Sequence, residues 1–122
     1  MTNSTHQATW ETYTASWAEA DIASQLKLFE QSLSPDCVYV DPIQQASGYE
    51  QLAGYMAALQ KNVPGARFVT TGFKEHHSRS LAHWNMVDGA GTVLAPGMSY
   101  AEYGADGRLQ KMTGFYDPPG AP

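Results

Sequence analysis

The first third of the chain has apolar residues at helical spacing. Trp10, Tyr13 and Trp17 recur every three or four positions, which predicts one helix over about residues 7–20. A second helix is predicted to follow Asp21, because aspartate is a common N-cap residue. The buried stripe of this second helix is predicted to consist of Ile22, Leu26, Phe29 and Leu33.

Proline positions divide the next segment. Pro35 is predicted to end the second helix, and the β-branched run Cys37–Asp41 is predicted to form a strand that ends at Pro42. Ser47 and Glu50, three residues apart, are typical of a capping box at the start of a third helix. The apolar face of that helix is predicted to be Leu52, Tyr55, Met56, Leu59 and Val63, with its end at Pro64-Gly65.

The second half of the chain alternates extended runs with turn residues. Four strands are predicted, at 66–76, 80–87, 92–103 and 108–117. The short gaps between them favour antiparallel hairpins, because a parallel connection needs about a dozen residues. The turns are predicted around Ser78-Arg79, at Asp88–Gly91 and at Gly104–Gly107, and the ends 1–6 and 118–122 are expected to be loose.

This order of elements predicts an α+β domain. Three helices precede a four-stranded antiparallel meander, and helices segregated from an antiparallel sheet define that class. A long sheet twists and curls, so we expect the helices to close its concave side around a cone-shaped pocket. One face of the run 92–103 carries only small side chains that leave room for a ligand, namely Val93, Ala95, Gly97, Ser99 and Ala101.

Composition narrows the function classes. The chain has 122 residues, enough for one domain, and a formal charge of −5 from 12 acidic and 7 basic residues. Such a balance argues against a nucleic-acid partner, which requires a basic surface. A single cysteine, Cys37, excludes an internal disulfide and a cysteine-based zinc site. We see no signal peptide and no apolar run of about 18 residues, so no membrane partner is expected and the cytoplasm is the predicted compartment.

Several short motifs, taken in order, resemble those of the nuclear-transport-factor-2-like superfamily, and within it the SnoaL-like polyketide cyclases and the ketosteroid isomerases. The resemblance covers about residues 8–118 and implies a curved sheet closed by three helices around a pocket. The superfamily contains isomerases, cyclases, hydrolases and binding proteins, so the fold alone does not name a reaction. The motifs are Trp17–Asp21, Val40–Pro42, Gly48–Leu52, His83-Trp84, Asp106–Leu109 and Phe115–Asp117.

The resemblance implies two catalytic residues and one departure. In the ketosteroid isomerases the proton-abstracting carboxylate belongs to a similar Asp-Pro step, which implies that Asp41 is a general base. The oxyanion-stabilising tyrosine corresponds by its spacing to Tyr13, although Tyr13 also fits a core stripe with Trp10 and Trp17. The position of the neutral carboxylic acid of those isomerases falls on Ser99, which can donate a hydrogen bond but is not an acid.

Physical reasoning gives Asp41 two interpretations. A carboxylate at the mouth of an apolar pocket is partly desolvated, which raises its pKa toward a range useful for a base. Alternatively, Asp41 ends a strand and binds neighbouring backbone amides. Asp117 and His83 are further catalytic candidates, although strand alternation directs Asp117 away from a pocket lined by Tyr116. No metal site and no cofactor are predicted.

The aromatic and methionine side chains predict the ligand. They favour a small apolar or weakly polar organic molecule, and the resemblance implies that this molecule is cyclic, aromatic, polyketide-like or steroid-like. We therefore expect an acid–base enzyme of the isomerase, cyclase or hydrolase type, and the alternative is a non-catalytic module that binds a small molecule or docks a protein. A homodimer through the outer sheet face is also expected. The predicted ligand-binding residues are Trp17, Phe29, Tyr55, Met56, Trp84, Met112 and Tyr116.

Overall fold

The structure, a computed structural model, describes residues 5–117 and contains three helices and six strands in one mixed sheet. In chain order the elements are α1 (Thr5–Ser16), α2 (Ile22–Ser32), β1 (Leu33–Val40), β2 (Gln45–Ser47), α3 (Gly48–Asn62), β3 (Arg67–His76), β4 (Arg79–Val87), β5 (Val93–Tyr103) and β6 (Leu109–Phe115). Two predicted ends are affected by these bounds: residues 5 and 6 belong to α1 rather than to a loose end, and residues 118–122 lie outside the described residues.

The sheet extends the predicted meander by two strands. Its order is β2-β1-β6-β5-β4-β3, in which β3 to β6 are antiparallel neighbours and β1 runs parallel to β6. The four predicted strands and their hairpin connections are therefore confirmed. The three-residue strand β2 pairs antiparallel with β1 and was missed because so short a run shows no periodicity.

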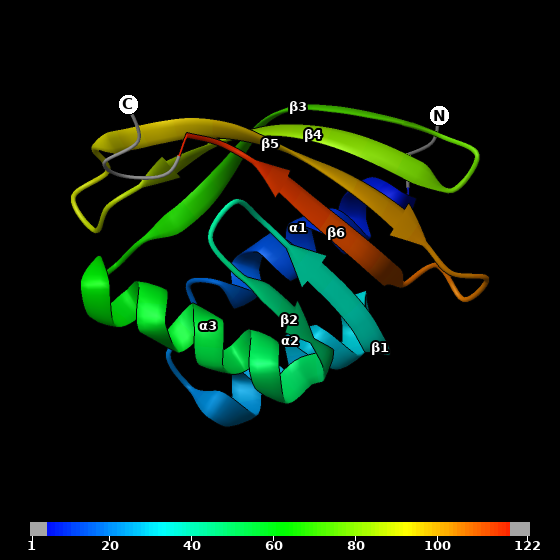
Figure 1. Ribbon diagram of the computed structural model, residues 1–122, viewed down its shortest axis with the longest axis horizontal. Coiled ribbons are helices and arrows are strands. Elements are labelled where there is room, and N and C mark those ends of the chain that lie inside the picture. The colour runs from blue at the N-terminus through cyan, green and yellow to red at the C-terminus, as the bar shows by residue number, and fades with distance from the viewer. Residues whose placement is uncertain (1–4, 118–122) are drawn as a thin grey trace.

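The helices cover one side of this curved sheet. Figure 1 shows the long strands β3 to β6 arching above α1 and α3, with α2 farther from the sheet. Side chains of all three helices and the inner sheet face form one continuous core, which includes Trp10, Phe29, Leu52 and Met112. The sheet does not close into a barrel, and the predicted α+β cone is confirmed.

The first two helices differ from the prediction in extent and in orientation. Helix α1 ends at Ser16 instead of residue 20, which leaves Trp17 in the turn that follows. Asp21 is the N-cap of α2, as predicted, and its carboxylate accepts from the Ser24 amide at 2.9 Å. The predicted stripe is wrong at Ile22, which is 82% exposed, and at Leu26, which is 44% exposed.

A polar contact explains why α2 is rotated. Gln25, Phe29 and Ser32 form its buried stripe, and the Gln25 amide donates to the backbone oxygen of Ser16 at 3.0 Å. The same oxygen also accepts from the Glu19 amide at 3.3 Å, so the Gln25 bond satisfies its second lone pair and joins α2 to the buried end of α1. Burial of Gln25 moves Ile22 and Leu26 to the solvent side.

Two details at Pro35 and Ser47 also differ. Helix α2 ends at Ser32, and Pro35 lies inside β1, in a stretch where the pairing register with β6 shifts. Proline is tolerated there because an irregular stretch requires no amide donor. Ser47 is the N-cap of α3, but its side chain makes no capping bond; instead the Gln51 side chain accepts from the Ser47 amide at 2.8 Å.

Candidate functional site

A cavity of about 320 Å³ lies between the concave sheet face and helices α1 and α3. Strand alternation places Trp84 and Ser99 in its wall, together with the small residue Ala95 of β5. Of the small face predicted for this strand, Ala95 and Ser99 border the cavity, whereas the Trp84 ring fills the space beside Gly97. Eight aromatic side chains line the cavity: Trp10, Tyr13, Trp17, Tyr39, Tyr55, Phe68, Trp84 and Tyr116.

Asp41 is the charged group buried in this wall, and it is 9% exposed. It follows the last residue of β1, where the chain turns toward β2. Its Oδ1 atom accepts from the backbone amides of Ile43 and Gln44, each at 2.8 Å. Its Oδ2 atom accepts from the hydroxyls of Tyr39 and Tyr55, each at 2.6 Å. Asp41 thus binds neighbouring backbone amides, as the second interpretation expected, and it also lies in the cavity wall.

The pKa of Asp41 lies below its ordinary value, opposite to the expectation from burial. Burial alone raises the pKa, but the bonds from Tyr39, Tyr55, Ile43 and Gln44 together lower it by more, because each stabilises the charged form. The sequence could not show this balance, because it depends on four donors that meet at one point. In this state Asp41 is an anion at neutral pH.

Four phenols surround this carboxylate, and all keep their protons. Burial is the largest cause that raises the pKa of Tyr13, Tyr39, Tyr55 and Tyr116, and the negative charge of Asp41 raises each further. Tyr13 is 2% exposed and lines the cavity, as its candidate role requires. Protonated phenols beside an anion make this end of the cavity rich in hydrogen-bond donors.

Ser99 lies at the same end of the cavity. Its hydroxyl oxygen accepts from the Trp84 indole N–H at 3.0 Å, which leaves the serine proton free to donate elsewhere. A methyl group at Gly114, the β6 residue paired with Ser99, would lie 3.8 Å from Ser99 Oγ, 3.7 Å from Tyr39 Oη and 3.5 Å from Asp41 Cβ. Asp41, Tyr39 and Ser99 therefore converge around one glycine.

The aromatic wall is continuous. Trp17 contacts Tyr39, Tyr55 and Phe68 at centroid distances of 5.5, 5.8 and 5.3 Å. Phe68 meets Trp84 edge-on at 5.0 Å, and Trp84 meets Tyr116 at 6.1 Å. Such pairs hold one another in place, so the cavity shape is largely preformed.

Four of the seven predicted ligand-binding residues line this cavity, and three do not. Trp17, Tyr55, Trp84 and Tyr116 lie in its wall. Phe29, Met56 and Met112 are each about 1% exposed and belong to the packed core instead. Phe29 stacks against Tyr49, Met56 contacts the Ser16 hydroxyl and the Gln25 amide through its sulfur, and Met112 pairs in the sheet with Tyr39 and Ala101.

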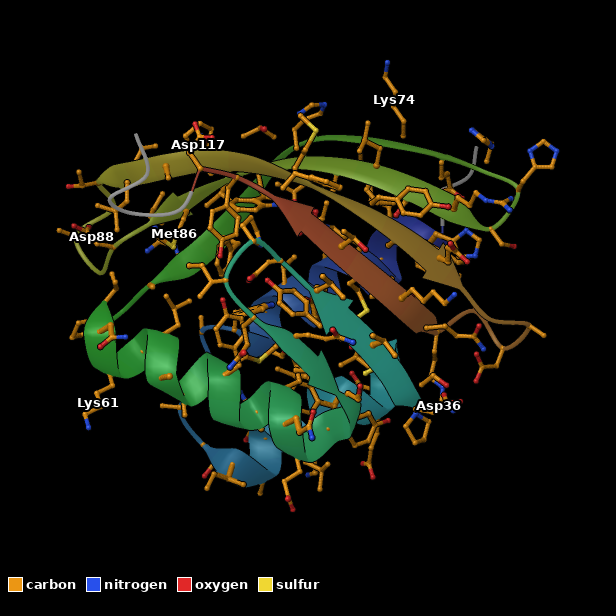
Figure 2. All side chains as sticks on the ribbon, in the orientation of Figure 1. Asp36, Lys61, Lys74, Met86, Asp88 and Asp117 are labelled. Carbon is orange, nitrogen blue, oxygen red and sulfur yellow. The ribbon has the colours of Figure 1, made fainter. Side chains whose placement is uncertain are left out.

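Asp117 and His83 lie in different places. Strand β6 ends at Phe115, so strand alternation does not extend to Asp117, which is exposed and borders the cavity rim. Figure 2 shows Asp117 beyond the end of β6, at the same end of the sheet as Met86. His83 is exposed on β4, between the inward residues Ala82 and Trp84, and it is not part of the cavity wall. Alternation directs it to the outer face.

The sequence analysis missed Tyr39, a direct partner of Asp41. The signal was present, because residues two apart on a strand share a face. It also missed Trp10, which lines the cavity and whose buried indole N–H has no hydrogen-bond partner among residues 5–117. Phe68 and Met86 were missed as well, because only the sheet register brings them opposite the helices.

Metal and membrane features were also searched. Within residues 5–117, no three His, Cys, Asp or Glu side chains come together in a group that could hold a metal ion. In the same range, no helix has the length and apolar character needed to cross a membrane.

Comparisons with known proteins agree with this architecture. A candidate isomerase of the SnoaL-like family from Agrobacterium tumefaciens is 29% identical, with a TM-score of 0.84 over 93% of this chain and 98% of that one. A candidate SnoaL-like polyketide cyclase from Jannaschia sp. CCS1 is 16% identical, with a TM-score of 0.74 over 96% of this chain and 91% of that one. TerC, crystallised with polyporic acid, is 18% identical, with a TM-score of 0.74 over 93% and 92%.

The family itself follows from the sequence match. A comparison with curated proteins finds no match. The family model described as the SnoaL-like domain, in contrast, matches residues 10–112, which include part of α1, all of α2 and α3, and most of the sheet. The chain therefore belongs to the SnoaL-like domain family.

Proposed function

We propose that this protein is an acid–base enzyme that moves a proton on a small cyclic carbonyl compound, with Asp41 as the general base. The observation that carries this proposal is the placement of a buried carboxylate within a cavity whose neighbouring groups are neutral phenols. Proton transfer beside a carbonyl needs this pair of features, a base for the proton and donors for the developing oxyanion. The 29% identical relative from Agrobacterium tumefaciens, named as a candidate isomerase, agrees with it.

The cavity chemistry supports a neutral or weakly polar ring as the substrate. Among the described residues, no Lys, Arg or His lines the wall, so nothing there would balance a phosphate or carboxylate group on the ligand. A volume of about 320 Å³ is at the lower end of ordinary ligand sites.

The proposed reaction balances without a cofactor. A C–H bond next to the carbonyl breaks, the proton moves to Asp41 Oδ2, and the electron pair moves onto the carbonyl oxygen to give an enolate. A phenol such as Tyr13, with Ser99 at the same end of the cavity, donates to that oxygen. Asp41 then returns the proton to another carbon of the enolate, which completes an isomerisation or prepares a ring closure.

Deuterium uptake tests the proposal without knowledge of the natural substrate. 1-Tetralone, a bicyclic ketone, exchanges the protons beside its carbonyl in D₂O, and NMR follows the loss of their signal. We expect the wild type to accelerate this exchange and Asp41→Asn to lose about 10²- to 10⁴-fold of the acceleration. Glu50→Gln, which removes an exposed carboxylate on α3, is the matched control. Equal rates for Asp41→Asn and the wild type would exclude Asp41 as the base.

One observation favours the alternative, a binding module without chemistry. The pKa of Asp41 is lowered and both of its oxygens already accept two hydrogen bonds, which makes it a weak base in the empty cavity. Under this alternative, 1-tetralone binds with a measurable heat or shift in NMR signals, yet its deuterium exchange stays at the rate of the buffer. The same experiment therefore separates the two functions.

We also propose that two copies pair through the outer sheet face. Met98 and Phe115 face each other across β5 and β6 on that side and are 39% and 57% exposed, with Val69 on β3 also exposed. Contiguous apolar surface of this kind is typical of an interface. Light scattering over a range of concentrations tests this directly: the wild type is expected at twice the monomer mass, and a monomer at all concentrations would contradict it.

A further inference from the structure

Asp41 has no acceptor position left for an incoming proton, as far as residues 5–117 show. Each of its oxygens already accepts two bonds, from the amides of Ile43 and Gln44 on Oδ1 and from the phenols of Tyr39 and Tyr55 on Oδ2. A carboxylate offers about four lone-pair positions in total. A base in this state acts only after one donor leaves, and the four donors differ in how firmly they are held.

Two of the donors are main-chain amides, and a third belongs to a buried side chain. Ile43 and Gln44 donate main-chain amides from the turn that Asp41 itself begins, and that turn also contains a backbone bond from Asp41 N to Gln44 O at 2.9 Å. Tyr39 lies two residues before Asp41 on the same face of β1, and its ring is 8% exposed. The strand therefore holds its hydroxyl against Oδ2.

Tyr55 is the exception. It reaches Asp41 from the separate element α3, its side chain is only half-buried, and it forms part of the cavity wall. Burial, Asp41 and then Tyr116 raise the pKa of its hydroxyl, so a second polar neighbour lies near it. Rotation of this side chain breaks no backbone hydrogen bond, and the ring contacts that must shift are those with Trp17 and Tyr39.

We propose that Tyr55 is an exchangeable donor. When the substrate binds, the Tyr55 hydroxyl moves from Asp41 Oδ2 to an acceptor oxygen of the substrate, and the carboxylate is then free to take a proton. The inference rests on the proposed function and names the class of substrate that activates the site: a neutral ring that carries a carbonyl or similar acceptor oxygen. One movement supplies both requirements of the reaction. The Tyr55 hydroxyl donates to the substrate oxygen on which negative charge develops. A lone pair of Asp41 Oδ2 is released at the same time and accepts the proton from carbon.

The exchange also changes the strength of the base. The bond from Tyr55 is among the causes that lower the pKa of Asp41, so its departure raises that pKa. The remaining titratable groups that face Asp41 are Tyr39, Tyr13 and Tyr116, and all three stay neutral because burial raises the pKa of each. Asp41 is thus a weak base in the empty cavity and a stronger one when an acceptor oxygen is bound.

A pair of matched probes tests this exchange. 1-Tetralone has the acceptor oxygen, and tetralin has nearly the same shape without it. The pKa of Asp41 is followed through its carboxyl carbon by ¹³C NMR, with and without saturating probe. Both probes exclude water and raise the pKa by burial, but we expect a clearly larger rise with 1-tetralone. Equal rises, or no rise while 1-tetralone is bound, would overturn the inference.

Two variants identify the tyrosine that moves. Tyr55→Phe is expected to raise the pKa of Asp41 before any probe is added and to abolish the difference between 1-tetralone and tetralin. Tyr39→Phe is the matched control, because it removes the other donor to the same oxygen and is expected to retain that difference. A wild-type response in Tyr55→Phe, or loss of the response in Tyr39→Phe alone, would contradict the assignment.

Kinetics separate this inference from the proposed function. The acid limb of kcat/KM reports the free enzyme and that of kcat reports the complex. For the wild type we expect the limb of kcat at higher pH than that of kcat/KM, and for Tyr55→Phe we expect a smaller separation, because only the burial by the ligand remains. Full exchange activity in Asp41→Asn defeats the proposed function whatever the NMR titration shows, whereas coincident limbs in an active wild type defeat only the role of Tyr55. Failure of both probes to bind defeats both.

Discussion

The concave and convex faces of the sheet alternate residue by residue along β4 and β5. Trp84 and Ser99 face inward and share a hydrogen bond at the cavity, whereas His83 and Met98, one position earlier in each strand, face outward. The inward pair is 8% and 7% exposed, and Met98 is 39% exposed. Because a slip of one residue would exchange the two sets, the register of these strands decides which side chains meet a ligand and which meet a partner.

The two faces also tolerate change differently. Inward side chains fit against helices, other aromatic rings and a shaped cavity, so their size and direction are constrained. Outward side chains are not confined by neighbouring side chains. Their replacement therefore changes only their contacts with water or with a second copy of the chain. Four predictions test this difference, from the largest expected effect on stability to the smallest.

The strongest contrast is between the neighbours Trp84 and His83. Trp84→Ala removes a ring that packs against Phe68 and Tyr116 and leaves Ser99 without its donor, so we expect a loss of about 3 kcal/mol in the free energy of unfolding. His83→Ala is expected to change it by less than about 0.5 kcal/mol. Urea unfolding of both variants measures the two values, and similar losses would contradict the assignment of faces.

Gly97 tests how closely the inner face is packed. It pairs with Trp84 in the sheet, and a Cβ at Gly97 would lie 2.3 Å from Trp84 Cη2. The indole must therefore move in Gly97→Ala, which we expect to cost about 1–3 kcal/mol and to weaken its bond to Ser99. Thermal unfolding and tryptophan fluorescence report the two effects.

Gly54→Ala is the control for Gly97→Ala. Gly54 lies within α3 with nothing within 4 Å of the added methyl, so alanine is expected to stabilise the helix by about 0.5–1 kcal/mol. A loss of stability in both variants would show that close packing of the inner face does not explain the loss in Gly97→Ala.

The charge of Asp41, on the inner face, makes the stability of the protein depend on pH. Its pKa is lowered in the folded state, so its contribution to stability is complete above the unfolded value of about 4 and is lost as the pH falls through the folded value. We expect the wild type to be more stable than Asp41→Asn by about 1–2 kcal/mol at pH 7. This difference should shrink below about pH 4, and urea unfolding at several pH values measures it. A difference that is independent of pH would contradict it.

The smallest effect on folding is expected at Phe115 on the outer face. Phe115→Ser replaces a ring that is 57% exposed, so we expect a change of less than about 0.5 kcal/mol in the dissociated protein. Light scattering should show weaker self-association than in the wild type. Unchanged self-association would move the proposed interface away from Met98 and Phe115.

Much of the fold could be predicted because local patterns agreed with it. The strands of the meander, their hairpins, the N-cap at Asp21 and the helix that follows Ser47 were all visible in the order of apolar, polar and turn residues. The errors arose where a tertiary contact overrides a local preference. Gln25 is buried in α2 because it satisfies a carbonyl group of α1, and Pro35 lies in a strand because that strand is irregular.

Several residues of the candidate site could be predicted from the sequence, but the protonation state of Asp41 could not. Asp41, Tyr13, Ser99, Tyr55 and Trp84 all border the cavity. Met56 and Met112 were assigned to it in error, because an apolar residue on the correct element can face either the cavity or the core. Pattern alone does not separate these two surroundings, since both are apolar.

The sequence by itself determined the SnoaL-like domain, the inward small face of β5 and a carboxylate at the end of β1, because each depends on residue type and spacing along the chain. Only the tertiary structure decided that Tyr39 from β1 and Tyr55 from α3 meet on one oxygen of Asp41 and reverse the effect of burial on its pKa. The reason is physical: the protonation of a carboxylate depends on the sum of its hydrogen bonds and its desolvation. That sum is set by groups 14 residues apart along the chain but 2.6 Å apart in space.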